Sequence, residues 1–428
     1  MDWFWPEGFY ALLMIGIFAF GAFAWKLPIA VAMTLSAVVG ALAAGQGIPL
    51  RHLVEGEFGY LNTILVIATA MMFMKVILET GLLDSLSAWM IRRFRKYPAL
   101  LSIGIMFIIM VPGMITGSST AAVLTTGALV SPLLMTLGMS KVRTAAVVSV
   151  GALLGMIAPP VSIPAMIICA GVDIPYVGFA LPLIICTFPL ALLFALTMVY
   201  PFIRKFSDEE ALEEHLKKMQ KNPLNIRLIL PVIVLVVLFA ADQYMAGKIP
   251  SMGMPFIFLV SALSGILSGV KFDVLKTATD AVDDALPVMG ILMGVGMFIQ
   301  IMTLIGVQGF IVVSALSLPS WMLYAAITVS MPLFGAVSSF GSASVLGVPF
   351  LLALLQYNSI IVASALSLIA SLGDLMPPTA LAGIFAAQVV KEENYFKVLK
   401  LCIVPAILIA LWGIAVIAVS GPIAAAIF

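Results

Sequence analysis

Long apolar segments dominate this chain, and polar residues are confined to short stretches between them. An apolar run of about 20 residues crosses the hydrocarbon core of a bilayer as a helix. On this basis the sequence predicts uninterrupted membrane helices at 8–26, 27–45, 62–83, 177–203, 228–243, 254–270, 286–306 and 398–424. Shorter amphipathic arms are expected between them, at 47–61, 84–97, 271–285 and 307–319.

Four further apolar segments do not fit a single unbroken crossing. Segments 98–139 and 320–357 are too long for one helix, and each carries a cluster of small residues near its middle. This pattern favours a re-entrant helical hairpin, which enters and leaves the membrane by the same face. Segments 142–171 and 359–390 contain Pro-Pro pairs. They are expected to be broken helices, because proline lacks an N–H group and clashes with the preceding turn.

Composition changes this picture only by excluding other classes of protein. The chain is 63% hydrophobic and 10% charged, whereas a soluble domain is about half apolar and about a quarter charged. The sequence therefore predicts an all-α polytopic membrane protein in a lipid bilayer. A net charge of +1 suggests no nucleic-acid partner. Neither His52 nor His215 lies in a predicted span, so no catalytic residue is predicted and the chain is not expected to be an enzyme.

The basic residues predict an orientation. With the N-terminus outside and both hairpins re-entrant, all of the 21 basic residues except Arg51, Lys75 and Lys248 fall on the inside. Cytoplasmic loops of membrane proteins carry such an excess of Lys and Arg. Both termini are therefore expected on the outer side of the membrane, which is the periplasmic side if the membrane is a bacterial inner membrane.

The chain divides into two halves with the same order of elements. Residues 1–205 form the first half, 206–227 a charged cytoplasmic linker, and 228–428 the second half. In the predicted orientation the first half begins inside and the second begins outside. The halves are therefore interpreted as inverted-topology repeats.

Each half also carries the same pair of motifs inside apolar segments. Gly117-Ser118-Ser119-Thr120 is followed by Ala158-Pro159-Pro160, and Gly341-Ser342-Ala343-Ser344 is followed by Met376-Pro377-Pro378. Interrupted hydrophobic segments at corresponding places in two halves point to the binding site of a secondary transporter. The alternative, that these small residues only allow close helix packing, fits one such cluster better than two matched pairs.

These motifs supply the chemistry of an ion and anion site. Free N–H groups at a helix start favour an anion, and unwound carbonyls favour a cation. Intramembrane acids such as Asp374 are costly and indicate a functional site, whereas Lys75 is expected to pair with Glu79 one turn away. One ion site is predicted at Gly117, Ser118, Ser119, Thr120 and the backbone of Ala158, and the other at Ser339, Gly341, Ser342 and Asp374. The anion is expected near Ser119, Thr120, Ser162, Ser342, Ser344 and Thr379.

At these motifs the chain resembles the large membrane subunit of TRAP (tripartite ATP-independent periplasmic) transporters, within the ion-transporter superfamily. The resemblance is carried by Leu27-Pro28-Ile29-Ala30, by Ile115-Thr116-Gly117-Ser118-Ser119, and by Leu154-Gly155-Met156-Ile157-Ala158-Pro159-Pro160-Val161-Ser162. It implies an elevator fold, in which a transport domain moves against a scaffold, in a bacterial or archaeal inner membrane. It also implies carboxylate import with Na⁺, a small four-helix membrane subunit and a periplasmic substrate-binding protein.

The chain departs from the family pattern in its acids. In the family, the Gly/Ser cluster at the hairpin tip is usually followed by an acid. Here the cluster at the tip of the first hairpin continues from Ser119 into Thr120-Ala121-Ala122-Val123, without an acid. The second break is instead preceded by Asp374-Leu375-Met376. Coupling to Na⁺ or to H⁺ therefore stays open, as does a stand-alone carrier of the same superfamily that needs no binding protein. An intramembrane enzyme and a passive channel are more distant alternatives.

Overall fold

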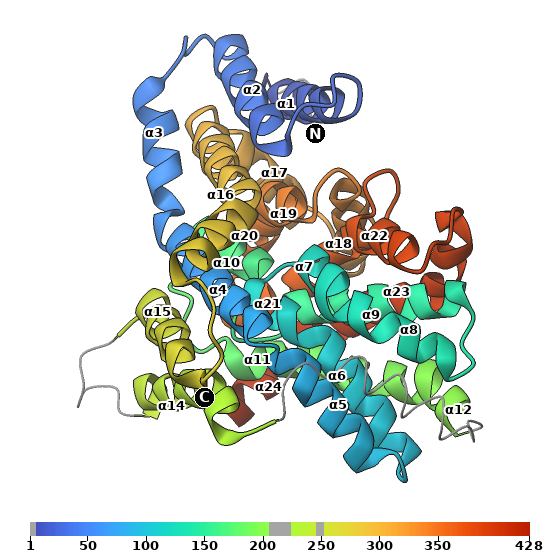
Figure 1. Cartoon of the computed structure of the whole chain (residues 1–428). Helices are drawn as coiled ribbons and strands as arrows, with labels where there is room; N and C mark the ends of the chain where they lie inside the picture. Colours follow the sequence, from blue (N-terminus) through green and yellow to red (C-terminus); the bar gives the residue numbers. More distant parts are fainter. Residues whose placement is uncertain (1–5, 205–223, 245–251) are drawn as a thin grey trace.

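The computed structural model of the chain describes residues 6–204, 224–244 and 252–428 (Figure 1). Over these ranges the secondary structure is helical, and they contain no strand. The predicted linker, 206–227, lies outside the described residues apart from 224–227.

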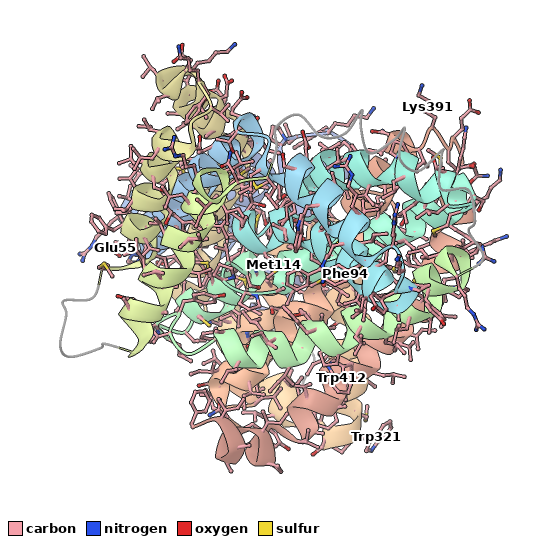
Figure 2. All side chains as sticks on the ribbon, turned by 60° about the horizontal axis from the view of Figure 1, so that its bottom comes forward. Glu55, Phe94, Met114, Trp321, Lys391 and Trp412 are labelled. Atoms are coloured by element: carbon pink, nitrogen blue, oxygen red, sulfur yellow. The ribbon has the colours of Figure 1, made fainter. Side chains whose placement is uncertain are left out.

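Several of the helices are suited to a bilayer. By length and composition, seven in the described ranges could cross a membrane: Pro6–Phe23, Leu61–Glu79, Pro98–Thr116, Ser119–Thr136, Ala180–Ile203, Val274–Leu304 and Tyr395–Ala418. Lys391 and Trp321 lie at opposite edges of the molecule in Figure 2. The protein is thus an all-helical, multi-pass membrane protein.

One set of helices, here called the α16 group, is assembled on a single long helix, directly or through the neighbours of that helix. Its members are α1 (Pro6–Phe23), α2 (Ile29–Ala43), α3 (Leu50–Gly59), α4 (Leu61–Glu79), α14 (Ile226–Tyr244), α15 (Met254–Ser264), η3 (Gly265–Ser268) and α16 (Val274–Leu304). Helix α16 packs along α2, α3 and α4. A Cβ on Gly56 would lie 2.7 Å from the carbonyl carbon of Gly296, so only glycine lets α3 and α16 approach this closely.

The start of α16 differs from the sequence prediction. The expected arm at 271–285 and the expected span at 286–306 form one helix, Val274–Leu304. Asp273 caps it by accepting a hydrogen bond from the backbone N–H of Lys276 at 3.0 Å. The charged residues at this end favour a separate solvated arm, but charge alone does not end a helix, and no glycine interrupts 274–286.

The second set, here called the tip group, holds both motif pairs. Its first half comprises α6 (Pro98–Thr116), α7 (Ser119–Ala122), η1 (Val123–Gly127), α8 (Ala128–Thr136), α9 (Lys141–Ile157), α10 (Ile163–Ala170), α11 (Ala180–Phe194), η2 (Ala195–Val199) and α12 (Tyr200–Ile203). Its second half comprises α18 (Ser320–Gly335), α19 (Ser339–Ser342), η4 (Ala343–Gly347), α20 (Val348–Ala353), α21 (Ser359–Ser371), η5 (Leu372–Leu375), α22 (Leu381–Val389) and α23 (Tyr395–Ala418). Of the remaining helices, α5 (Leu82–Phe94) packs on α6, α24 (Ser420–Ile427) packs on α21, and α17 (Val307–Leu316) packs on both α20 and α16.

The two groups occupy different sides of the molecule. Helices α3, α14, α15 and α16 lie on the left of Figure 1, and α8, α9, α12 and α22 lie on the right. Within the tip group the two halves interleave, because α22 packs on α9 and α10 packs on α21. Residues far apart in the sequence are thereby brought to one place between the groups.

Candidate functional site

Each motif pair begins with a helix start capped by serine. Ser118 has an extended backbone, and its hydroxyl accepts a hydrogen bond from the N–H of Ala121 at 3.3 Å. Ser338 does the same for the N–H of Gly341 at 3.1 Å. Each cap precedes a four-residue α-helix and then a π-helical turn. Such π-helical turns are frequent at functional sites.

This geometry changes the register in which the two tips correspond. The sequence motifs matched Ser118 with Ser342, whereas the matching caps are Ser118 and Ser338. Ser339, rather than Ala343, is therefore the counterpart of Ser119. The second half contains four serines between 338 and 344, so the sequence alone offered several registers, and the cap selects one of them.

The helix breaks at the two Pro-Pro pairs are also alike. Helix α9 ends at Ile157 before Pro159-Pro160, and η5 ends at Leu375 before Pro377-Pro378; both Pro-Pro bonds are cis. A tyrosine hydroxyl donates to a backbone carbonyl at each break: Tyr176 to Pro160 at 3.2 Å, and Tyr395 to Leu375 at 2.5 Å. These bonds satisfy carbonyls that the interrupted helices leave without a helical partner.

Each break is tied to the tip of its own half. The N–H of Val161 donates to the carbonyl of Met114, near the middle of Figure 2, at 3.1 Å. In the second half the hydroxyl of Thr379 donates to the carbonyl of Ala336 at 2.7 Å. Tip and break therefore form one unit in each half.

Asp374 connects the two units. Its side chain is 3% exposed and lies in η5, directly before the second break. The hydroxyl of Ser119, from the first tip, donates to its carboxylate, and the hydroxyl of Ser339, from the second tip, also interacts with it. The Asp374 carboxylate thus faces Ser119 and Ser339, each of which is the first residue after a serine cap. Met156 is its counterpart in the first half, because each precedes the first proline of its break by the same number of residues.

A cavity of about 490 Å³ opens beside this carboxylate, between the two helix groups. The tip group contributes Ser118, Ser119, Thr120, Ala121, Leu124, Thr125, Met156, Ser338, Ser339, Phe340, Asp374, Leu381 and Phe385. The α16 group contributes Ile29, Met71, Met74, Lys75, Leu78, Asp283, Asp284, Pro287, Val288 and Ile291. One wall therefore carries hydroxyls and a carboxylate, and the facing wall carries apolar side chains with one cation and two acids.

The cation on the facing wall has a partner that the sequence did not predict. Lys75 Nζ lies 2.7 Å from the carboxylate of Asp284 on α16. The expected pair with Glu79 is not formed, because packing of α4 against α16 brings Asp284 closer. Asp284 was expected to be a solvated acid on an arm; it is 53% exposed and still pairs with Lys75.

The structure separates the predicted site residues into two sets. Ser118, Ser119, Thr120, Ser339 and Asp374 line the cavity, whereas the rest do not: Gly117, Ala158, Ser162, Gly341, Ser342, Ser344 and Thr379. The hydroxyl of Ser342 donates to Met331 O at 2.7 Å, and that of Ser344 donates to Gly341 O at 2.8 Å. Both hydroxyls are thus engaged with backbone within their own half.

Ser162 occupies a different environment at the first break. Its side chain is fully buried, and its hydroxyl has no hydrogen-bond partner. A buried hydroxyl without a partner costs free energy, so its oxygen, beside the unwound backbone, is available to a ligand. Within the described ranges, no cluster of three His, Cys, Asp or Glu side chains could hold a metal ion. Hydroxyl, carbonyl and single-carboxylate oxygens are therefore the donors that this site offers.

Lys75 and Asp284 were not among the site residues predicted from the sequence, and Ser338 was expected only as one of the hydroxyls at the second tip. Ser338 also carried a signal for its capping role, since a serine directly before a helical turn is a typical N-cap. Lys75 carried one too, because an isolated charge in an apolar span indicates function by default. Asp284 carried none, because nothing local shows which distant helix faces it.

Known proteins share this organisation. Residues 13–423 match the sequence model of a family described as the DctM component of the tripartite ATP-independent periplasmic transporter. Among solved structures, the fold is similar to the crystal structure of the YdaH transporter from Alcanivorax borkumensis, described as having an unusual topology. The TM-score is 0.59 at 16% sequence identity, over 87% of this chain and 88% of that one, so the likeness concerns the fold alone. A search of curated proteins finds no match.

Proposed function

The chain belongs to the DctM component family of tripartite ATP-independent periplasmic transporters, and we propose that it imports a small organic anion, a carboxylate, on a sodium gradient. The family match confirms the resemblance seen in the sequence, and it identifies the chain as the permease component of such a system. The observation that carries the proposal is the position of Asp374, between Ser119 and Ser339 at the edge of the cavity.

Asp374 and the two hydroxyls are the proposed centre of ion coupling. Carboxylate and hydroxyl oxygens are hard donors of the kind that bind alkali and alkaline-earth cations. A cation there offsets the cost of a buried carboxylate, which is large when the charge has no counterion. The oxygen of Ser162 supports a second cation at the first break, close to the predicted site at Ala158. Proton coupling at Asp374 is the alternative, and it uses the same carboxylate.

The anion is proposed to lie in the cavity, close to the tips. Asp374 repels it unless a cation is bound, so anion and cation binding support each other. Lys75 on the opposite wall attracts a carboxylate if Asp284 releases it. A half-exposed pair of this kind is worth only about 0.2–1 kcal/mol, so a substrate carboxylate can replace Asp284 at little cost.

Transport is proposed to follow the elevator scheme, with the tip group moving against the α16 group. The cavity lies between these groups and takes residues from both, which supports this division. Interpreting the halves as inverted repeats belongs to the same proposal, as does a periplasmic location for both termini at the bacterial or archaeal inner membrane. In that orientation Lys75 is nearer the cytoplasmic face.

The family also indicates which partners the protein needs. We propose that it works with a small four-helix membrane subunit and a periplasmic substrate-binding protein. The test is uptake of radiolabelled carboxylates into proteoliposomes, with the protein alone or with both partners, under an inward Na⁺ or H⁺ gradient. Uptake that requires both partners and Na⁺ supports the proposal. Uptake by the protein alone supports the stand-alone carrier, and flux without a gradient requirement contradicts ion coupling.

A further inference from the structure

A second cavity lies within the tip group, away from the tips and their carboxylate. It measures about 300 Å³ and is a groove between α9, the α11–η2 segment and α23. Its walls are almost wholly apolar, and Arg143 is the single charged residue that lines it. Arg143 belongs to the first turn of α9, so the charge sits at the end of the groove where that helix begins.

The groove faces outward at the level of two membrane helices. Leu193 is 41% exposed and Val404 is 64% exposed, and they belong to the candidate spans Ala180–Ile203 and Tyr395–Ala418. Exposed apolar side chains at this level contact lipid rather than water. The groove is thus open to the hydrocarbon region, and an acyl chain can fill it.

Irregular turns in two of the three helices coincide with the groove. The α11–η2 segment changes to a π-helix at Ala195–Val199, and α23 contains Pro405 within its length. Both features interrupt the regular ridges by which neighbouring helices mesh. The irregular backbone of η2 and α23 therefore prevents close packing between them and leaves the space that forms the groove.

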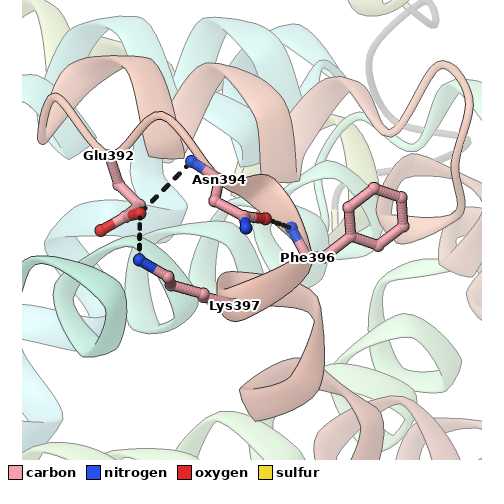
Figure 3. Close-up of polar contacts among 4 residues, drawn as sticks. All are labelled: Glu392, Asn394, Phe396 and Lys397. Carbon is pink, nitrogen blue, oxygen red and sulfur yellow. Dashed lines mark hydrogen bonds and ion pairs between the residues drawn. The ribbon is translucent and has the colours of Figure 1, made fainter.

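Within the described ranges, the cations near the groove have no acid paired with them. The guanidinium of Arg143 lies 5.1 Å from the centre of the Phe202 ring, and no ion pair joins it to an acid in the described ranges. Lys400, one turn before Val404 on α23, also has no such pair there. The nearby acid Glu392 is already engaged, by Lys397 at 3.3 Å and by the N–H of Asn394 at 3.3 Å (Figure 3).

The Asn394 N–H, with Lys397, also keeps the pKa of the Glu392 carboxyl below its usual value. Glu392 is therefore a charged acid with its own cation, and within the described ranges it is not paired with Arg143 or Lys400. Basic pockets between membrane helices on the cytoplasmic side bind the headgroups of anionic lipids.

We propose that this groove binds an anionic phospholipid, with an acyl chain along Val147, Leu193 and Val404 and the phosphate against Arg143 and Lys400. Each cation near the headgroup is worth about a fivefold gain in affinity, whereas the acyl chain exchanges one apolar surface for another and mainly fixes the position of the lipid. Helices α9, α11 and α23 belong to the group that carries Asp374, so the lipid would be attached to the part of the protein that holds the ion site.

Retention of phosphatidylglycerol and phosphatidylethanolamine by the purified full-length protein, measured by native mass spectrometry, tests this proposal. The wild type is expected to retain phosphatidylglycerol preferentially. Arg143→Gln removes the cation and is expected to lower that retention about fivefold. Val404→Trp fills the groove without changing its charge and is expected to lower the retention of both lipids. Arg227→Gln on α14 is the matched control and is expected to bind as the wild type does.

Three outcomes would overturn the proposal. Equal retention of both lipids by the wild type contradicts a site for an anionic headgroup. Loss in Val404→Trp without loss in Arg143→Gln indicates an apolar groove that takes any lipid. Displacement of phosphatidylglycerol by millimolar inorganic phosphate indicates a site for free phosphate. Arg143→Lys, which keeps the charge, separates the loss of a cation from a folding defect, because it is expected to retain the lipid.

Discussion

Ser119 and Asp374 are joined by a hydrogen bond although 255 residues separate them in the chain. The bond links the first residue after one serine cap to the residue three positions before the other half's Pro-Pro pair. Ser339 approaches the same carboxylate from the second tip. The proposed ion coupling depends on this meeting of both halves at one acid.

Ser339 is predicted to matter more for ion coupling than Ser344. Ser339→Ala removes an oxygen that faces Asp374 and is expected to raise the Na⁺ concentration for half-maximal uptake several-fold, for a loss of about 1–2 kcal/mol. Ser344→Ala is the matched control, because its hydroxyl bonds to the backbone of its own turn. Measuring uptake against Na⁺ in proteoliposomes distinguishes them. A larger effect from Ser344→Ala would favour the register predicted from the sequence motifs.

Asp284 is predicted to compete with the transported carboxylate for the ammonium group of Lys75. Asp284→Asn frees the ammonium group and is expected to lower the KM for the transported carboxylate by up to about fivefold. Lys75→Gln is expected to raise it. Asp280→Asn, one turn earlier on α16, removes the same charge from outside the cavity lining and should leave KM unchanged. If Lys75→Gln and the wild type share one KM under the same Na⁺ gradient, Lys75 does not contact the anion.

In each half, one close contact between two glycines is predicted to hold the helix before the tip against the helix before the break. A Cβ on Gly113 would lie 2.8 Å from the backbone of Gly155, and a Cβ on Gly335 would lie 2.7 Å from that of Gly373. Gly113→Ala and Gly335→Ala are each expected to destabilise the protein by about 1–3 kcal/mol through overpacking. Gly309→Ala, where the added methyl meets nothing within 4 Å, is the control. Thermal unfolding in detergent measures the difference, and equal midpoints for all three variants would exclude a tight backbone contact.

Tyr395 is predicted to stabilise the second break. Tyr395→Phe removes the donor to the carbonyl of Leu375 and is expected to cost about 1 kcal/mol. Tyr97→Phe, at an exposed ring, controls for the loss of a hydroxyl. Hydrogen exchange of the segment around Asp374 should rise in Tyr395→Phe alone. Unchanged exchange there would show that the break is held by other contacts.

Much of the helical plan follows from local sequence. The Pro-Pro pairs interrupt helices where proline chemistry requires it. Gly117, with a φ of 65°, ends α6 in the left-handed conformation that favours glycine. The prediction is wrong at the start of α16, because the charged residues favour an arm that is separate from the span. A capped start at Asp273 and packing along three helices produce a single helix instead.

The site itself could be predicted only in part. Asp374 was recognisable because an acid inside an apolar segment is costly, and the tips were recognisable from small residues in pairs. That Ser119 and Ser339 meet at one carboxylate depends on the interleaving of the halves, which no local pattern contains. Lys75 shows the same limit, since the local rule favours Glu79 whereas helix packing provides Asp284.

The most direct test of the account replaces Asp374 by asparagine, which keeps the shape of the side chain and removes its charge. Carboxylate uptake into proteoliposomes would be measured for the wild type and Asp374→Asn, with the partner subunits, across inward Na⁺ gradients of increasing size and with H⁺ gradients in parallel. The account predicts that Asp374→Asn loses or greatly weakens the dependence of uptake on the ion gradient while the protein stays folded. Uptake by Asp374→Asn with the ion dependence of the wild type would contradict it.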